Sequence, residues 1–146
     1  MAKKLWGIDL GGTKMEGVVL KSAEDPEVLV RLRHETEARK GYQHVLSRLK
    51  ALLDKLIAEA GEKPSSIGIG TPGTRDPQTG LHKNSNSTVL NGRPFKEDLA
   101  NLFGIPVEMA NDANCFALAE ARMGAAPEVD PKAKVVFGVI MGTGCG

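Results

Sequence analysis

Two short apolar runs separated by a pair of glycines constrain the fold of this chain most. The opening segment LWGIDLGGTKMEGVVL predicts strands over Leu5–Leu10 and Met15–Leu20, joined by a turn at Gly11 and Gly12. Residues Glu27–Glu35 alternate apolar and polar side chains, which predicts a third strand with one solvated face. Because the links between these strands are short, we expect the chain to begin with an antiparallel meander.

Helical spacing follows the meander. Gly41–Ala60 places Val45, Leu49 and Leu52 on one stripe, and Gly61 stands where a C-terminal cap belongs. Beyond that helix, short strands and helices alternate. We expect a strand within residues 65–70, a loop rich in Pro and Gly over 71–80, a helix over 94–103, a strand over 105–110 and a helix within 111–124.

The last residues predict the beginning of a second unit. Ala125–Lys134 is rich in Pro, Ala and charge, as linkers are, and the segment VVFGVIMGTGCG then repeats the opening pattern of an apolar strand that ends in a glycine turn. This repetition indicates a duplicated architecture. We therefore divide the chain into a first domain, residues 1–132, and the first strand and turn of a second domain, residues 133–146, which we expect to continue after Gly146.

Charge and composition argue against several classes of protein. The 146 residues carry a formal net charge of +1, which predicts no strong attraction to nucleic acid or to acidic membranes. No apolar run approaches the ~20 residues of a membrane span, and the N-terminus lacks the long apolar stretch of a signal peptide. Cys115 and Cys145 lie in unrelated contexts and predict neither a disulfide framework nor a metal site. We expect a cytoplasmic protein.

The first glycine turn has the composition of a phosphate-binding loop. The N–H groups of Gly11 and Gly12 can form an anion-binding concavity, to which Thr13 adds a hydroxyl and Lys14 a positive charge. Asp9 would repel a phosphate unless a cation lay between them, which predicts Mg²⁺ oriented by Asp9 through water. The alternative is a tight hairpin in which Asp9 only caps the turn. A second turn of the same type is expected at Gly142, Thr143 and Gly144.

A carboxylate follows the strand expected at 105–110. Asn111 and Asp112 stand where this strand meets the next helix, an edge of the sheet at which ligands collect. Either residue could serve only as the N-cap of the helix. Alternatively, Asp112 accepts the proton of a substrate hydroxyl during phosphoryl transfer, in which orientation matters more than basicity.

The remaining polar residues are less specific. Residues 84–91 are dense in amides and hydroxyls, which suits a sugar but also suits a solvated loop. Cys115 and Phe116 lie in the apolar part of their helix and predict core positions. The three histidines lack ligand spacing and predict exposed or capping roles; they are His34, His44 and His82.

Taken together, these motifs resemble the ROK family (repressors, open reading frames and sugar kinases) of the actin-like ATPase superfamily. The resemblance rests on GIDLGGTK, GIGTPG, NDANC and GTGCG, which occur in the family's order, and the segment KNSNSTVLNGRPF is most similar to the bacterial fructokinase (mannokinase) branch. It implies an RNase H-like α/β fold, with a mixed sheet whose first three strands are antiparallel and which helices flank. It also implies ATP- and Mg²⁺-dependent phosphorylation of a hexose, fructose being favoured, at its primary hydroxyl.

The resemblance also implies roles for single residues. Asp112 is similar to the catalytic base of the family, and Asn111 to its sugar-binding neighbour. Asp9 matches the carboxylate that orients the metal. The further sugar contacts would be Gly73, Thr74 and Asn86, and the phosphate loops would comprise Gly11, Gly12, Thr13, Lys14, Gly142, Thr143 and Gly144.

Family kinases of this type carry a second domain with the adenine pocket and commonly a structural zinc site, so we expect this chain to be an N-terminal half that is inactive alone. The complete kinase is expected to bind a sugar and ATP, and a homodimer is one possible assembly.

A sugar-sensing transcriptional regulator is the main alternative, disfavoured because the phosphate turn begins at Gly7, which leaves no room for a DNA-binding module. An actin-like assembly or chaperone ATPase is a third, against which the polar loop and Asn111–Asp112 argue.

Overall fold

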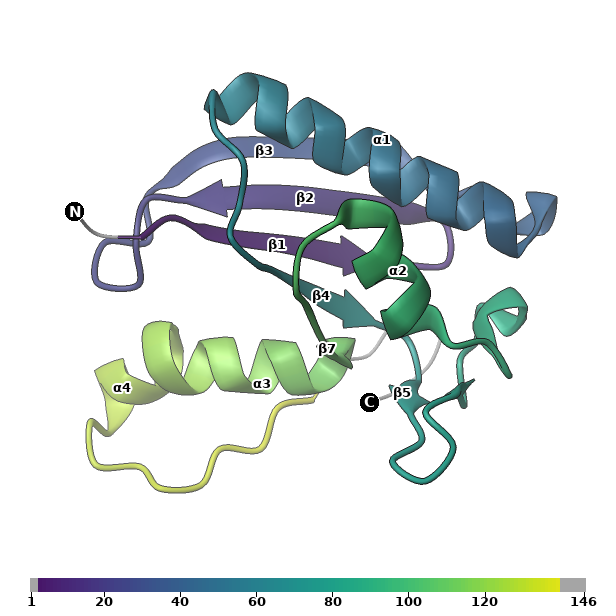
Figure 1. Ribbon diagram of the computed structural model, residues 1–146. Coiled ribbons are helices and arrows are strands. Elements are labelled where there is room, and N and C mark those ends of the chain that lie inside the picture. The colour runs from purple at the N-terminus through teal and green to yellow at the C-terminus, as the bar shows by residue number, and fades with distance from the viewer. Residues whose placement is uncertain (1–2, 140–146) are drawn as a thin grey trace.

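A five-stranded mixed sheet forms the centre of the chain in the computed structural model, which describes residues 3–139 (Figure 1). The strand order is β3-β2-β1-β4-β7. β1 pairs antiparallel with β2 and β2 with β3, whereas β4 pairs parallel with β1 and with β7. The expected α/β fold with an antiparallel meander is confirmed. The strands are β1 (Leu5–Leu10), β2 (Lys14–Leu20), β3 (Val28–Glu35), β4 (Ile67–Thr71) and β7 (Val107–Asn111).

Helix α1 (Tyr42–Ala60) covers one face of this sheet (Figure 1). It ends where Gly61 adopts φ +72° and donates its N–H to the carbonyl of Ile57. Its apolar stripe packs on the strand residues whose side chains point to the same face, among them Ile8 and Ile69. The predicted helix is confirmed, and its seven buried residues form much of the core with the strands: Tyr42, Val45, Leu46, Leu49, Leu52, Leu53 and Leu56.

The segment expected to be a plain loop contains a small hairpin. β5 (Thr74–Arg75) pairs antiparallel with β6 (His82–Lys83), and a 3-10 turn, η2 (Thr88–Leu90), precedes helix α2 (Phe95–Phe103). Two-residue strands show no alternation of side chains, so the sequence pattern does not reveal them. The hairpin matters because it folds the polar segment back toward the carboxyl end of β4.

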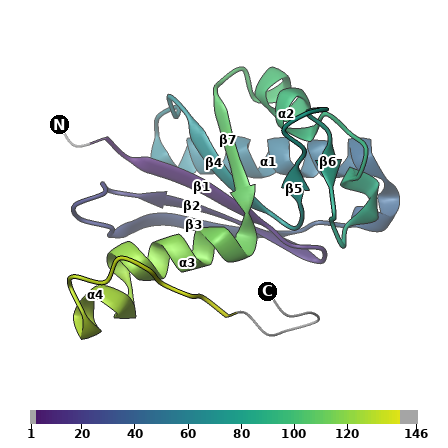
Figure 2. The ribbon, with the colours of Figure 1, turned by 90° about the horizontal axis from the view of Figure 1, so that it is seen from below.

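Helix α3 (Asp112–Met123) lies on the opposite face of the sheet from α1, as Figures 1 and 2 show. A short helix, α4 (Ala125–Val129), follows directly, so the prediction of a linker beginning at Ala125 was wrong. Pro127 favoured the linker interpretation, but proline is tolerated in the first turn of a helix, where its missing N–H would have no partner in any case.

The strand predicted at the start of a second domain extends beyond the described residues and stays a prediction. Residues 135–139 pair with none of the described strands, and Val135 and Phe137 are almost fully exposed. The expectation that Cys115 and Phe116 are core residues was wrong. Phe116 is not in the core, since its side chain is 39% exposed, and Cys115 is only half-buried. None of the side chains of α3, all of which the structure describes, is buried. Within residues 3–139, no helix is long and apolar enough to cross a membrane.

Candidate functional site

The carboxyl ends of the three parallel strands meet at one edge of the sheet. Asp9 of β1 stands beside Gly70 of β4, and Thr71 of β4 stands beside Asn111 of β7. The glycine turn follows β1, the segment Pro72–Gly73 follows β4, and α3 follows β7. This edge is the usual ligand-binding position in open α/β sheets, so the topology brings the separate motifs of the sequence to one place (Figure 2).

The turn between β1 and β2 has the expected hairpin form. The N–H of Gly11 donates to the carbonyl of Lys14 at 2.9 Å. A Cβ at Gly11 would lie 2.7 Å from that carbonyl oxygen, so a glycine is required there. Gly12 and Thr13 are exposed at the tip, and Lys14, also exposed, begins β2. Of the predicted phosphate-binding groups, those of Gly12, Thr13 and Lys14 are therefore accessible, whereas the N–H of Gly11 is occupied within the turn.

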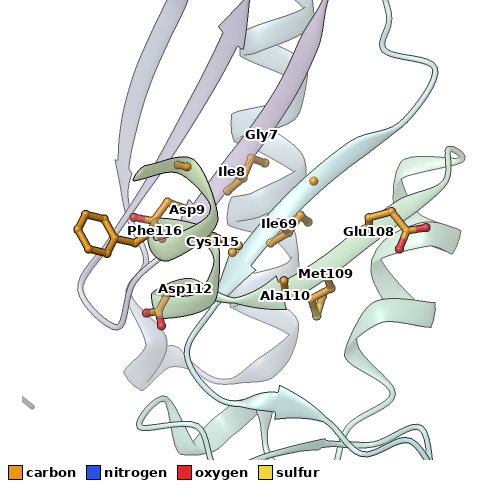
Figure 3. Close-up of a pocket in the computed structure, with 13 residues that line it drawn as sticks. Gly7, Ile8, Asp9, Ile69, Glu108, Met109, Ala110, Asp112, Cys115 and Phe116 are labelled. Carbon is orange, nitrogen blue, oxygen red and sulfur yellow. The ribbon is translucent and has the colours of Figure 1, made fainter. Parts of the chain in front are cut away.

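Asp9 and Asp112 lie on the α3 side of the sheet (Figure 3), and both are close to Gly70. A Cβ placed on Gly70 would lie 3.7 Å from Oδ1 of Asp9 and 3.8 Å from Cα of Asp112. The pKa of Asp9 is raised above its ordinary value, first because the carboxyl group is partly desolvated and then because the carboxylates of Asp112 and Glu16 repel its charge. A bound cation would relieve this repulsion.

The carboxylates at this edge of the sheet suit Mg²⁺ better than a metal ion whose ligands all come from protein side chains. Among the described residues, no three His, Cys, Asp or Glu side chains gather into a metal-binding group. Mg²⁺ commonly uses only one or two carboxylates and takes its other ligands from water and substrate phosphates. Asp9 is placed to be such a carboxylate, since it is the last residue but one of β1 and lies two positions before Gly11 of the turn.

Asn111 is the N-cap of α3. Its Oδ1 accepts from the N–H of Ala113 at 3.1 Å and from that of Asn114 at 3.4 Å, while its Nδ2 donates to the carbonyl of Gly73 at 2.9 Å. Asn111 thus joins the start of α3 to the loop after β4. Asp112 is the first helical residue and is half-buried, with its carboxylate at the sheet edge. Its Oδ1 also accepts from the N–H of Ala113, at 2.8 Å, so Asp112 shares in satisfying the start of the helix.

Gly73 is required by the hairpin that packs against it. It adopts φ +79°, and a Cβ there would lie 2.4 Å from the carbonyl oxygen of Lys83 and 2.8 Å from the nitrogen of Ser85. Thr74, the next predicted sugar contact, is exposed and belongs to β5. The hairpin is what gives the loop after β4 its fixed shape.

The polar segment also reaches the glycine turn. A cavity of about 250 Å³ is lined on one side by Gly12 and on the other by residues 86–89, with Arg39 at its edge. Asn86 is exposed there, whereas Ser85 and Ser87 are buried and support the loop. The structure thus brings a predicted sugar contact and a predicted phosphate-binding residue to one cavity.

A larger cavity of about 890 Å³ lies between α3 and the sheet (Figure 3). Glycines and apolar groups form most of its wall, and Asp9 and Asp112 provide carboxylates. Glu108, which also lines it, lies apart from these two carboxylates in Figure 3. The cavity exists because β1 and β4 present glycines to α3 at Gly7, Gly68 and Gly70.

Three predicted site residues cannot be placed. Gly142, Thr143 and Gly144, assigned to a second phosphate turn, lie outside the described residues. Two other residues were missed by sequence reasoning. Thr36 is 1% exposed and bonds to the glycine turn, and His82, expected to be exposed or capping, is 2% exposed with Nε2 2.8 Å from the carbonyl oxygen of Pro72. No local pattern marks either residue, because their partners are distant in sequence.

Comparison with known proteins decides the family of this chain. The sequence profile of the ROK family matches residues 5–146. The chain belongs to the ROK family. The match covers all four motifs on which the resemblance was based.

Individual members of the ROK family are similar over most of this chain. An N-acetyl-D-glucosamine kinase of Haemophilus influenzae is 36% identical over 141 residues, which are 97% of this chain and 44% of the relative. The crystal structure of a ROK hexokinase from Thermus thermophilus is 34% identical with a TM-score of 0.70, over 84% of this chain and 40% of that one. The crystal structure of an inorganic polyphosphate/ATP-glucomannokinase from Arthrobacter is 29% identical with a TM-score of 0.76, over 99% of this chain and 56% of that one. The chain therefore spans less than half the length of the curated relative.

Proposed function

We propose that this chain is the N-terminal half of a two-domain kinase, which transfers the γ-phosphoryl group of ATP to the primary hydroxyl of a hexose. The names of the similar ROK proteins support the reaction class, since they are kinases of hexoses and of an N-acetylated hexosamine. The name of the Arthrobacter enzyme supports ATP as the donor. The second half would supply the adenine pocket, and the second phosphate turn is predicted at Gly142, Thr143 and Gly144 of this chain.

One observation carries the proposal. Asn111 accepts from the N–H groups of Ala113 and Asn114, and Oδ1 of Asp112 accepts a second bond from Ala113. The other carboxylate oxygen of Asp112 accepts no hydrogen bond from the described residues and is not needed for the cap. A carboxylate at this position, beside the end of β1, can accept the proton of a hydroxyl that attacks a phosphate held at the glycine turn. A loose transition state requires orientation of the base more than strong basicity.

The other residues of the site take supporting roles. The N–H of Gly12, with Thr13 and Lys14, binds phosphate oxygens, whereas the N–H of Gly11 closes the turn on the carbonyl of Lys14. Asp9 orients Mg²⁺ through water, and the ion, when bound, neutralises charge on the transferring phosphoryl group. Asn111, Gly73 and Asn86 hold the sugar hydroxyls, since the amide groups offer both donors and acceptors.

The acceptor sugar remains a prediction. Residues 83–95 favour fructose, whereas the relatives cited above are named for other hexoses and for N-acetyl-D-glucosamine. These sugars differ at carbons remote from the primary hydroxyl, so the same base and the same phosphate turn can serve all of them.

A coupled assay of ADP release tests the proposal. The two-domain protein is supplied with MgATP and, in separate reactions, with fructose, glucose, mannose, N-acetyl-D-glucosamine and N-acetyl-D-mannosamine. We expect sugar-dependent ADP release with at least one of them, and none from residues 1–146 alone, because half of a cleft does not position both substrates. Tight sugar binding without phosphorylation of any sugar would instead favour a sugar-sensing regulator.

A further inference from the structure

Thr36 joins both arms of the glycine turn although it lies more than twenty residues further along the chain. It directly follows β3 and is 1% exposed. Its hydroxyl donates to the carbonyl of Gly11 at 2.8 Å, and its N–H donates to the carbonyl of Thr13, also at 2.8 Å. One buried residue therefore holds the peptide groups on either side of the tip.

The bond to Gly11 fixes the direction of the next N–H group. A trans peptide is planar, so the carbonyl of Gly11 and the N–H of Gly12 point in opposite directions. Because the hydroxyl of Thr36 holds the carbonyl on the inner side of the turn, the N–H of Gly12 is directed outward. Within residues 3–139, that N–H donates no hydrogen bond to another group of the chain, and Gly12 is exposed.

The turn requires such a bond because its own residues are poorly restrained. Gly11 is required by its close approach to Lys14, and Gly12 has no side chain that could limit its backbone. Two consecutive glycines lose more conformational freedom on becoming ordered than any other pair of residues. A turn that was left to order itself around an anion would lose that entropy on binding and would bind more weakly.

We propose that Thr36 is a positioning residue for the donor substrate, whose hydroxyl holds the Gly11–Gly12 peptide so that the N–H of Gly12 meets a phosphate oxygen of the bound nucleotide. This inference rests on the proposed function, because it takes the glycine turn to be a phosphate site. Thr36 would thus affect nucleotide binding through the Gly11–Gly12 peptide, without itself contacting the nucleotide or the sugar.

The test compares four variants of the two-domain protein, of which Thr36→Ala is a second variant without the hydroxyl in case Thr36→Val does not fold. Thr36→Val keeps the shape and burial of the side chain but removes the hydroxyl, and Thr36→Ser restores the hydroxyl. Ser22→Ala is the matched control. Ser22 is 3% exposed and its hydroxyl accepts from the N–H of Asp25 at 3.0 Å, so it secures the β2–β3 loop at the other end of the sheet. Calorimetric titration with MgATP gives Kd, and thermal melts show that each variant is folded at the assay temperature.

We expect Thr36→Val to raise the Kd for MgATP about tenfold, the effect of losing one ordered hydrogen-bonding group. Thr36→Ser and Ser22→Ala should stay within about threefold of the parent protein. In kinetics, the KM for ATP should rise in Thr36→Val while the KM for the sugar stays within about twofold, since the sugar residues lie on other loops.

Several results would overturn the inference. An unchanged Kd in a folded Thr36→Val protein would do so, as would equal weakening in Thr36→Ser. If Thr36→Val and Thr36→Ala both fail to fold, Thr36 is structural and the positioning role is rejected. If the parent protein binds no MgATP, the glycine turn is not a nucleotide site. A parent protein that binds MgATP but phosphorylates no sugar would contradict the proposed function alone, and the Kd comparison would still decide the role of Thr36.

Discussion

The two faces of the sheet differ in what their side chains do. Toward α1, β1 presents Trp6, Ile8 and Leu10, all buried, and the helix adds seven buried residues of its own. Toward α3, the same strand presents Gly7 and Asp9, and α3 has no buried side chain among its twelve, all of them described (Figure 1). The face toward α1 forms the hydrophobic core, whereas the face toward α3 leaves a cavity beside the carboxylates of Asp9 and Asp112.

Glycines on the two faces show the same division. A Cβ at Gly17, on the α1 face, would lie 2.6 Å from Cδ1 of Leu56, so close packing of the helix requires that glycine. A Cβ at Gly70, on the α3 face, would meet its nearest atom, Sγ of Cys115, at 3.6 Å, which is an ordinary contact. Close packing within the described chain therefore does not require a glycine at position 70. The glycine instead keeps the space beside Asp9 and Asp112 open.

The largest expected effect is on turnover and comes from the α3 face. Asp112→Ala in the two-domain protein should lower single-turnover phosphorylation at saturating sugar by about 10²–10⁴-fold, the usual contribution of a positioned base. MgATP affinity should stay close to that of the parent. The melting temperature should fall only slightly, because the bond from the N–H of Ala113 to Asp112 is lost while Asn111 remains as the N-cap. A folded variant that phosphorylates within about tenfold of the parent would remove Asp112 from the catalytic role.

A pair of glycine variants compares the two faces directly. Gly17→Ala should destabilise the fold by about 1–3 kcal/mol in urea unfolding, since the added methyl group would overpack the core against Leu56. Gly70→Ala should leave stability unchanged or slightly raised, because alanine restricts the unfolded chain and the methyl group has space. Turnover should follow the opposite order, with Gly70→Ala the slower enzyme. Equal loss of stability in both variants would contradict the division between the faces.

Asn111→Ala tests how much the N-cap of α3 contributes to stability. Loss of the bonds to Ala113 and Asn114 should destabilise α3 by about 0.5–2 kcal/mol. Asn111→Asp is the matched variant: it keeps the capping oxygen but loses the donor to the carbonyl of Gly73. We expect Asn111→Asp to retain most of the stability and to bind sugar more weakly. Full sugar affinity in Asn111→Asp would show that the link to Gly73 has no part in the site.

The smallest effect is on stability and depends on pH. The pKa of Asp9 is raised in the folded protein, so its ionisation destabilises the native state once the pH exceeds the ordinary pKa. Asp9→Asn should therefore melt slightly higher than the parent at pH 7, and the difference should vanish as the pH falls below that value. Its Mg²⁺-dependent activity should be reduced. A melting temperature below that of the parent at pH 7 would show that Asp9 contributes contacts that outweigh the repulsion.

Much of the fold was predictable because the periodicity of apolar residues along a strand or helix indicates which of its faces is buried. The meander and α1 ended within a residue or two of their expected bounds, since alternation and the helical stripe are both strong there. The β5–β6 hairpin and α4 were missed because each is too short to show a period. Their positions depend on contacts such as that of Gly73 with Lys83, which no local pattern reveals.

The candidate site was predictable where chemistry and spacing coincide. Asp9, the glycine turn and Asn111–Asp112 lie together because parallel strands bring their carboxyl ends to one edge. Which residue of the pair caps α3 could not be decided from the sequence, since Asn and Asp are equally good caps. Thr36 could not be found either, because a buried threonine after a strand resembles any other until its partner on the turn is known.

The most direct test of the account is the location of the bound metal–nucleotide complex. Mn²⁺ in place of Mg²⁺ broadens nearby amide signals, so the isotope-labelled two-domain protein is titrated with MnATP and observed by NMR. We predict the strongest broadening at Asp9, Gly12 and Gly70, at the carboxyl ends of β1 and β4, and little at Ser22 or at Leu49 within α1. Broadening centred on the β2–β3 loop or on α1, with the signals of Asp9 and Gly12 unaffected, would contradict the account.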